Sequence, residues 1–353
     1  MIRKSGIHTY SISKELTNRQ YQEIIQSASR YGRPYHSTWA GEEKSTAKRT
    51  YRFENFPGIQ FTLYNITTDE YNVGIKRVTV QIEPCRLLGD RDPTALFHPT
   101  KQNYGALLKR LGNVFATLSI PGEPDTMPLC SVDITENIFL DSPAMVQGYL
   151  HVLKKSLGPR DYKLEKFHKG KTKDVHRANQ HSHCLKANHV TILAYDKVDQ
   201  LQMIGRGNEL IDEKSILRIE VQMKRKKFLQ YVREDAVGNR AILKELYRQR
   251  QAIIGGYLKK MRLAYGNHFT YQSAVSWIER SIKKPEQRER MLLLLRKCSD
   301  CKDLTKAIKY LEEEGGISKK QIEGILEKFQ KLGLSPITIP SAYEITNLQP
   351  LGR

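Results

Sequence analysis

Over the first two thirds of the chain, apolar and polar residues alternate in short runs, a pattern that predicts β-strands. Pro57-Gly58 separates two of these runs and predicts a hairpin turn. Apolar residues at helical spacing follow Asn18, a candidate N-cap, and Ser142-Pro143, a typical helix start. The predicted strands cover residues 6–13, 49–56, 59–66, 78–82, 132–140, 189–195 and 216–223, and a further predicted helix covers residues 103–118.

This alternation is lost between Gly158 and Asn188, where Lys and His are frequent and apolar residues are few. A connection of this length is uncommon inside a compact domain, so we predict a functional or mobile loop. After about residue 235 helical periodicity takes over, and Gly315-Gly316 separates the last two predicted helices in helix–turn–helix fashion. The predicted helices here cover residues 240–265, 273–283, 288–297, 304–314 and 319–331.

These patterns predict an α+β fold, with a mainly antiparallel β-sheet and flanking helices, followed by a basic all-helical C-terminal domain. The change of pattern places the α+β domain at residues 1–235 and the helical domain at residues 236–353.

The charge of the chain indicates its partner. The 353 residues include 58 Lys and Arg and 38 Asp and Glu, a formal charge of 58 − 38 = +20. Five scattered cysteines favour a reducing, cytoplasmic environment over a disulfide framework. No apolar run approaches the roughly 20 residues of a membrane span, and no secretory signal is visible. We therefore expect no membrane association, and we expect a polyanionic partner, with nucleic acid the first candidate.

Acidic residues interrupt apolar strands at three positions, Asp133, Glu220 and Glu83. Carboxylates on adjacent strands, with their side chains on one sheet face, can hold a divalent cation through hard oxygen ligands. The alternative is that each is an outward residue of an alternating strand, paired to a neighbouring Arg or Lys. The sequence alone leaves both open.

A candidate nucleophile ends the strand over residues 189–195. The hydroxyl of Tyr195 is a poor nucleophile at the ordinary tyrosine pKa of about 10, and a cation or metal makes it competent by stabilising the phenolate. Lys197 is two residues further on, so a continuing strand would place it on the same face as Tyr195. The alternative is a half-buried structural tyrosine.

Histidines gather just before this strand. Their spacing matches no structural zinc finger, and we expect most of them to be solvent-facing loop residues. His189 differs, because we expect it to begin the strand that carries Tyr195. A lone Cys298-Ser299-Asp300-Cys301 has no second pair, which argues against a metal or redox role. The residues of the histidine-rich segment are His176, His181, His183, Cys184 and His189.

Basic residues are concentrated after the last predicted strand. Residues 224–262 contain 12 Lys and Arg but three acidic residues, a balance that favours phosphate contact over a solvated helix face. The densest run is Lys224, Arg225, Lys226 and Lys227.

Three segments in this order resemble the gene II/X replication proteins of filamentous phages and related plasmids. They are Ser131-Val132-Asp133-Ile134-Thr135, then residues 191–198 (TILAYDKV), then Leu217-Arg218-Ile219-Glu220-Val221 leading into Lys224-Arg225. The resemblance covers roughly residues 75–235, and residues 316–322 resemble a stretch near the C-terminus of the family.

The resemblance implies a rolling-circle replication initiator that nicks one DNA strand at an origin. It implies Tyr195 as the nucleophile and Lys197 as the assisting cation, and His189 resembles a histidine six residues before that tyrosine. Asp133 and Glu220 are implied as ligands of Mg²⁺ or Mn²⁺. Glu83 is not included, because the family does not always have an acidic residue at the corresponding position. For DNA contacts we add Arg218, Lys224, Arg225, Lys226 and Lys227.

The implied reaction is a transesterification that leaves a 5′-phosphotyrosine link and a free 3′-OH primer. The expected partners are origin DNA, as supercoiled duplex and single strand, and the host replication helicase and polymerase. We expect the helical domain to bind DNA. Two alternatives stay open: a conjugative relaxase with the same chemistry, and a non-catalytic sequence-specific DNA-binding regulator.

Overall fold

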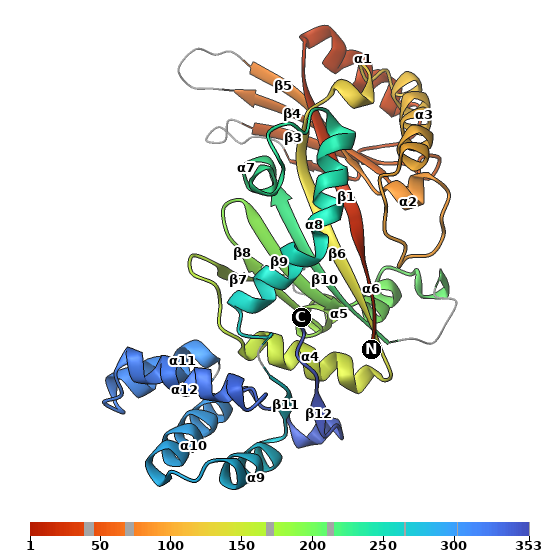
Figure 1. Cartoon of the computed structure of the whole chain (residues 1–353). Coiled ribbons are helices and arrows are strands. Elements are labelled where there is room, and N and C mark those ends of the chain that lie inside the picture. The colour runs from red at the N-terminus through yellow and green to blue at the C-terminus, as the bar shows by residue number, and fades with distance from the viewer. Residues whose placement is uncertain are drawn as a thin grey trace. The chain divides into compact units, whose positions relative to one another are not determined.

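The structure, a computed structural model, describes residues 1–38, 46–67, 74–166, 173–209, 215–264, 266–301 and 303–352. The chain divides into two compact units. Figure 1 labels their helices and strands. We call residues 5–135 and 222–250 the N-terminal unit, and residues 1–4, 136–221 and 251–353 the C-terminal unit.

The N-terminal unit is built on an antiparallel meander. Within it the strands follow the order β2-β3-β4-β5-β1-β6, and Tyr10 of β1 lies opposite Ile82 of β5. At the β3–β4 hairpin the φ of Gly58 is +83°, a conformation that favours glycine, and a Cβ there would lie 2.7 Å from the carbonyl oxygen of Glu83. Its strands are β1 (Ile2–Leu16), β2 (His36–Thr38), β3 (Thr46–Arg52), β4 (Ile59–Thr67), β5 (Gly74–Ile82) and the first part of β6 (Leu129–Leu140).

Helices flank this meander because each carries one apolar face. Helix α1 begins after a capping box of Thr17 and Gln20, and the hydroxyl of Ser27 in α1 lies 2.7 Å from that of Ser119, just after α3. The apolar faces of these helices are buried, and Ile24 of α1 and Leu107 of α3 have no exposed surface. The helices are α1 (Asn18–Ser29), α2 (Pro84–Leu87), α3 (Lys101–Thr117), α7 (Arg225–Phe228) and the first half of α8 (Asn239–Lys260).

The C-terminal unit holds the strands in the order β6-β10-β9-β8-β7. Helix α4 packs against β8 and β9, and it begins as predicted, with Ser142 at the N-cap and Pro143 in the first turn. Ser182 of β8 lies opposite Tyr195 of β9. The elements are α4 (Pro143–Lys155), β7 (Lys163–Glu165), α5 (Lys173–Gln180), β8 (Ser182–Lys186), β9 (Val190–Asp196), α6 (Lys197–Met203) and β10 (Ser215–Lys224).

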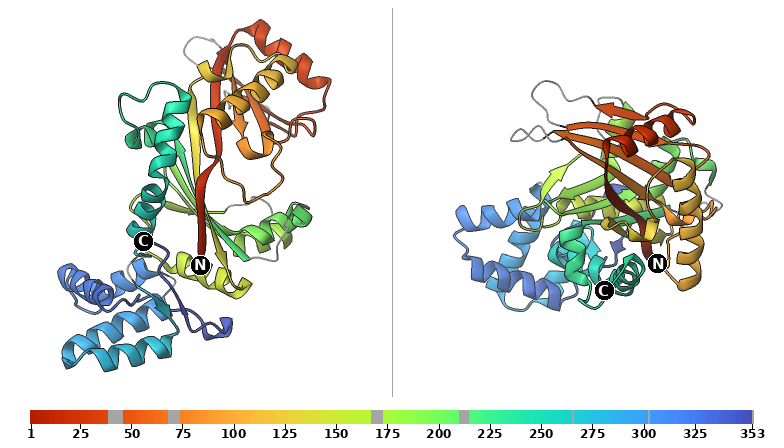
Figure 2. Two further views of the ribbon diagram at one scale, coloured as in Figure 1. Left: turned by 45° about the vertical axis from the view of Figure 1, so that its right-hand side comes forward. Right: turned by 90° about the horizontal axis from the view of Figure 1, so that it is seen from above.

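In the described part of the C-terminal unit, four further helices follow the second half of α8. Helix α10 packs against α9, α11 and α12 (Figure 2), and buried residues such as Ile278, Leu294 and Phe329 fill the space between them. Strands β11 (His268–Phe269) and β12 (Asn347–Leu348) form a two-stranded sheet. The helices are α9 (Tyr271–Ser281), α10 (Pro285–Asp300), α11 (Leu304–Glu313) and α12 (Lys319–Lys331).

The predicted fold class is confirmed: an α+β fold with a mainly antiparallel sheet and a helical C-terminal part. The predicted long loop between residues 158 and 188 is wrong, because β7, α5 and β8 occupy much of it; its residues 167–172 lie outside the described residues. The division of the chain into units also differs from the predicted division at residue 235. Strands β1, β6 and β10 each contribute residues to both units, so no single cut in the chain separates them.

Within the described ranges, no helix is long and apolar enough to cross a bilayer.

Candidate functional site

A buried polar network joins three strands of the C-terminal unit. Tyr195 is the sixth residue of β9, and Arg218 and Glu220 lie two residues apart on β10, so both project from one face of that strand. The Tyr195 hydroxyl donates a hydrogen bond of 2.8 Å to Oε1 of Glu220. Exposure is 5% for Tyr195, 0% for Arg218 and 4% for Glu220. The predicted acid and the predicted nucleophile are therefore in direct contact.

Arg218 extends the network to β6. Its Nε donates a hydrogen bond of 2.7 Å to Oδ1 of Asn137, whose side chain is fully buried. Arg218 is also hydrogen-bonded to Tyr195. The phenol thus contacts both a carboxylate and a guanidinium, and Asn137 accepts a hydrogen bond from the guanidinium.

This environment decides the protonation of the phenol. Burial, together with the negative charge of Glu220, raises the pKa of Tyr195 well above its ordinary value, and the positive charge of Arg218 opposes the rise. At neutral pH Tyr195 is therefore a hydrogen-bond donor. Glu220 lies where it can accept the phenolic proton, and Arg218 where it can stabilise the phenolate.

Arg218 is a cation that contacts the Tyr195 phenol, whereas Lys197 does not continue the strand that carries Tyr195. Strand β9 ends at Asp196, whose carboxylate accepts hydrogen bonds from the backbone amides of Val198 and Asp199 and so starts helix α6. Lys197 is the first residue of that helix, and its Nζ donates to Oε1 of Gln200 at 2.9 Å. The prediction that Lys197 continues the strand face of Tyr195 is wrong, because the Asp196 cap ends the strand between them.

His189 lies at the other end of the strand. It is exposed in the turn between β8 and β9, and β9 begins one residue later, at Val190. Six residues separate it from Tyr195, which in extended backbone corresponds to about 20 Å. The structure therefore does not bring His189 to the Tyr195 hydroxyl.

Of the other histidines, His176 lies in α5 and His183 in β8, whereas His181 lies in the turn between them. His183 and Cys184 are buried in β8, contrary to the prediction of solvent-facing loop residues. Burial and the nearby charge of Lys154 lower the pKa of His183 to about 4, so it is neutral at physiological pH. Across the described ranges no three His, Cys, Asp or Glu residues gather as a metal-binding group.

Asp133 belongs to the N-terminal unit. It projects from the first part of β6, is 9% exposed and accepts a hydrogen bond from the hydroxyl of Thr9. Around Asp133 and Glu220 the hydrogen-bonding groups include hydroxyl oxygens, from Thr9 and Tyr195. Carboxylate oxygens are ligands that Mg²⁺ and Mn²⁺ accept, so each acid taken by itself suits the predicted cation. Glu83, at the end of β5, lies with Oε1 3.8 Å from Nε2 of His8.

The predicted DNA contacts separate into buried and exposed residues. Arg218 has no exposed surface, so it cannot present its guanidinium to a DNA backbone at the surface of the protein. Lys224, Arg225 and Lys226 are exposed where β10 meets α7, and Nη1 of Arg225 donates to the carbonyl of Leu129 at 2.9 Å. Lys227 is half-buried, and its Nζ donates to Oε1 of Gln230 at 2.8 Å. Lys224 and Lys226 are the strongest candidates for phosphate contact in this run.

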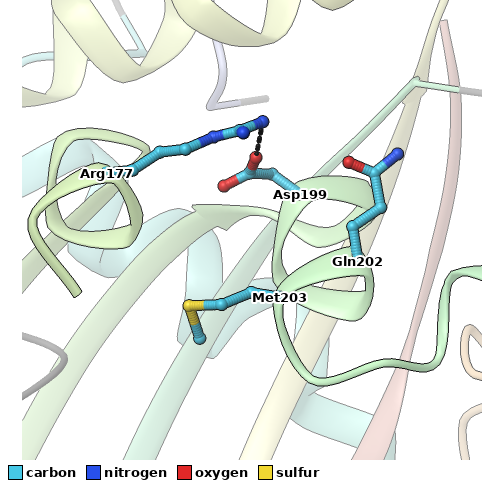
Figure 3. A pocket seen from close by; sticks show the side chains of 4 residues that line it. All are labelled: Arg177, Asp199, Gln202 and Met203. Carbon is cyan, nitrogen blue, oxygen red and sulfur yellow. Dashed lines mark hydrogen bonds and ion pairs between the residues drawn. The ribbon is translucent and has the colours of Figure 1, made fainter. Parts of the chain in front are cut away.

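A small pocket that the sequence did not indicate lies between α5 and α6. Arg177, Asp199, Gln202 and Met203 line about 270 Å³ of space (Figure 3). Arg177 points toward Asp199 and donates to its Oδ1 at 2.7 Å, while Nδ1 of His181 lies 3.2 Å from Oδ2. Because Asp199 is already paired with Arg177 and His181, we assign it to holding α5 and the turn after it against α6.

Asn137 and the role of Arg218 were also missed by sequence reasoning. The signal was the alternation itself: polar Asp133, Thr135 and Asn137 share one face of β6, as Arg218 and Glu220 share one face of β10. Only the pairing of the two strands in space shows which of these side chains meet.

Comparison with models of known protein families finds no match for this chain, and comparison with curated proteins finds no relative.

Proposed function

We propose that the protein is a rolling-circle replication initiator that nicks one DNA strand at an origin, with Tyr195 as the nucleophile. The observation that carries the proposal is the buried contact of the Tyr195 hydroxyl with both Glu220 and Arg218. It is supported by the order of the three segments that resemble gene II/X proteins, two of which contribute these residues. The charge of +20 supports a nucleic-acid partner.

In the proposed reaction the Tyr195 oxygen attacks the phosphorus of the scissile phosphodiester in line with the 3′ oxygen. The bond from phosphorus to tyrosine forms as the bond from phosphorus to the 3′ oxygen breaks. The phenolic proton passes to Glu220, 2.8 Å away, and the released 3′ oxygen takes a proton from solvent. The products are a 5′-phosphotyrosine link and a free 3′-OH, and the phosphodiester energy is conserved for rejoining.

Arg218 takes the role that we had predicted for Lys197. Its guanidinium is held by Asn137 beside the phenol, so its charge stabilises the phenolate and the additional negative charge of the transition state. Because Tyr195 is only 5% exposed, the side chains that cover it must move when DNA enters. An unpaired strand reaches such a recessed group more easily than a duplex, which favours supercoiled substrate.

Mg²⁺ or Mn²⁺ belongs to the same proposal. The resemblance implies Glu220 and Asp133 as its ligands, and a cation bound at either residue would supply positive charge to the scissile phosphate. Replacing Glu220 by Gln and Asp133 by Asn, each by itself, tests whether the metal dependence of nicking changes.

The experiment is a nicking assay on supercoiled DNA that carries the cognate origin, with Mg²⁺ or Mn²⁺ present. Tyr195→Phe should abolish nicking and leave DNA binding intact. Tyr104→Phe is a matched control, because Tyr104 is also buried and its hydroxyl donates to Oδ1 of Asp125 at 2.5 Å. Nicking that survives Tyr195→Phe, or that is lost with Tyr104→Phe in folded protein, contradicts the assignment.

The same assay separates the alternative functions. A conjugative relaxase would nick a transfer origin in preference to a replication origin. A non-catalytic regulator would bind its DNA site without nicking any supercoiled substrate.

A further inference from the structure

Helix α9 carries an exposed face with one large aromatic side chain. Ser273, Ser276, Trp277, Arg280 and Ser281 follow the spacing i, i+3, i+4, i+7 and i+8, which places them on one side of the helix. With Gln272 they line a hollow of about 510 Å³, which we call the Trp277 face. The opposite side of α9 is apolar and buried, so the exposed side is not needed for packing within the helix cluster.

The indole of Trp277 is held in place but not covered. It stacks on the ring of Phe269, with 5.6 Å between centroids and an angle of 26° between planes. Phe269 belongs to β11, and its register partner is Asn347 of β12, which anchors the stack. Yet 47% of Trp277 remains exposed. A rigid, half-exposed indole provides a flat surface for a second aromatic group.

The residues around the indole suit nucleic acid better than a protein surface. The lining residues of the Trp277 face contribute three hydroxyls, an amide and a guanidinium, and none of them is acidic. Trp277 is the one apolar residue among them, whereas a protein-docking site gathers several. Exposed Lys283 and Lys284 follow at the end of the helix and add positive charge. Base stacking with phosphate contacts from Arg and hydroxyl groups is the usual combination in single-strand binding.

We propose that the Trp277 face binds single-stranded DNA, with one base stacked on the indole and a neighbouring phosphate at Arg280. Bases inside a duplex are already stacked on each other, so an exposed indole selects unpaired strand. The inference rests on the proposed function in that DNA is the polymer, and it adds a binding site for the unpaired strand that is separate from the Tyr195 network.

The two tryptophans of the chain allow a direct test. In a Trp39→Phe variant of the full chain, Trp277 is the one indole fluorophore. Titration with a twelve-residue oligo-dT should quench this fluorescence in a saturable manner, and a duplex of equal length should quench it far less. Loss of one base stack corresponds to about 5- to 150-fold in affinity, so we expect Trp277→Ala to weaken oligo-dT binding, measured by anisotropy, by at least about 10-fold. Arg280→Gln should weaken it and reduce its salt dependence.

Two controls guard the result. Tyr271→Ala removes another aromatic residue of α9, 37% exposed and outside the hollow, and should leave affinity unchanged. Trp277→Phe keeps a ring against Phe269 and should bind with intermediate affinity, which separates loss of stacking from loss of folding.

Each other outcome overturns the inference in its own way. Unchanged Trp277 fluorescence at oligonucleotide concentrations that saturate the anisotropy signal excludes this face while leaving DNA binding in place. Equal quenching by duplex excludes selection of single strands. A change of oligomeric state in Trp277→Ala, seen by sedimentation, assigns the face to contacts between copies of the chain. Absence of binding to any DNA removes both this inference and the proposed function.

Discussion

Replacing Glu220 by Gln perturbs the Tyr195 network most selectively, because the two side chains have nearly the same size. The change turns a charged acceptor of the Tyr195 hydrogen bond into a neutral one and leaves Arg218, which is fully buried, beside the phenol without that carboxylate. A hydrogen bond to a charged group contributes about 1.5–3 kcal/mol, and removing one partner from a buried charged pair costs about 3–5 kcal/mol. Since Asn137 still accepts a hydrogen bond from Arg218, we expect the lower part of this range, a loss of about 3 kcal/mol.

Urea unfolding followed by circular dichroism measures this loss, with the wild type and variant compared at equal m-value. Arg218→Met and the double variant complete a cycle. If the two residues act as one cluster, the double variant should be more stable than the sum of the single losses predicts, by at least about 1 kcal/mol. Additive losses, or a loss below about 1 kcal/mol in Glu220→Gln, would refute the argument that this network is a coupled buried cluster.

Three other predictions follow from the same geometry. His183 has a pKa of about 4 in the folded protein and about 6.5 when unfolded, so its contribution to stability is present above pH 6.5 and lost as the pH falls toward 4. That loss reaches about 3 kcal/mol in the free energy of unfolding. His183→Leu should remove this pH dependence, and an unchanged pH profile of the free energy of unfolding would contradict a buried, neutral His183. Replacing Lys224 and Lys226 together by Gln should reduce the slope of log affinity for duplex DNA against log salt by about 1.8, whereas an equal slope would show that neither contacts phosphate. Arg218→Met should abolish nicking, whereas Lys197→Gln should retain it, with DNA binding measured as the control. Nicking that survives Arg218→Met but is lost in Lys197→Gln would make Lys197 the assisting cation.

Much of the fold could be predicted because its determinants are local. The long strands alternate clearly, Pro57-Gly58 turns the β3–β4 hairpin, and Ser142-Pro143 starts α4. The prediction of a solvent-facing loop in the His-rich segment was wrong, because His183 and Cys184 give no strong apolar signal in the sequence. Both lie in β8, and the pairing of β8 with β9 buries them. Burial there is a property of the neighbouring strand and not of the segment itself.

The site could be predicted in part for the same reason. Tyr195 and Glu220 were identified from their strands, and the structure brings them into contact. Lys197 was misplaced although a local signal existed, since Asp196 is a typical N-cap and ends the strand before it. Asn137 and Arg218 required knowledge of which strands lie side by side. The division into units likewise depends on strands that serve both units, which no change of composition along the chain reveals.

Mapping the residue that becomes attached to DNA tests the central claim most directly. Full-length protein is incubated with supercoiled cognate origin DNA and Mg²⁺ or Mn²⁺, the DNA is digested, and the adduct is located by mass spectrometry of peptides. The account predicts a nucleotide adduct on the peptide that contains Tyr195, joined to the 5′ phosphate, with a free 3′-OH at the nick. An adduct on any other residue, or a nick whose 5′ phosphate is free of protein throughout, would contradict it.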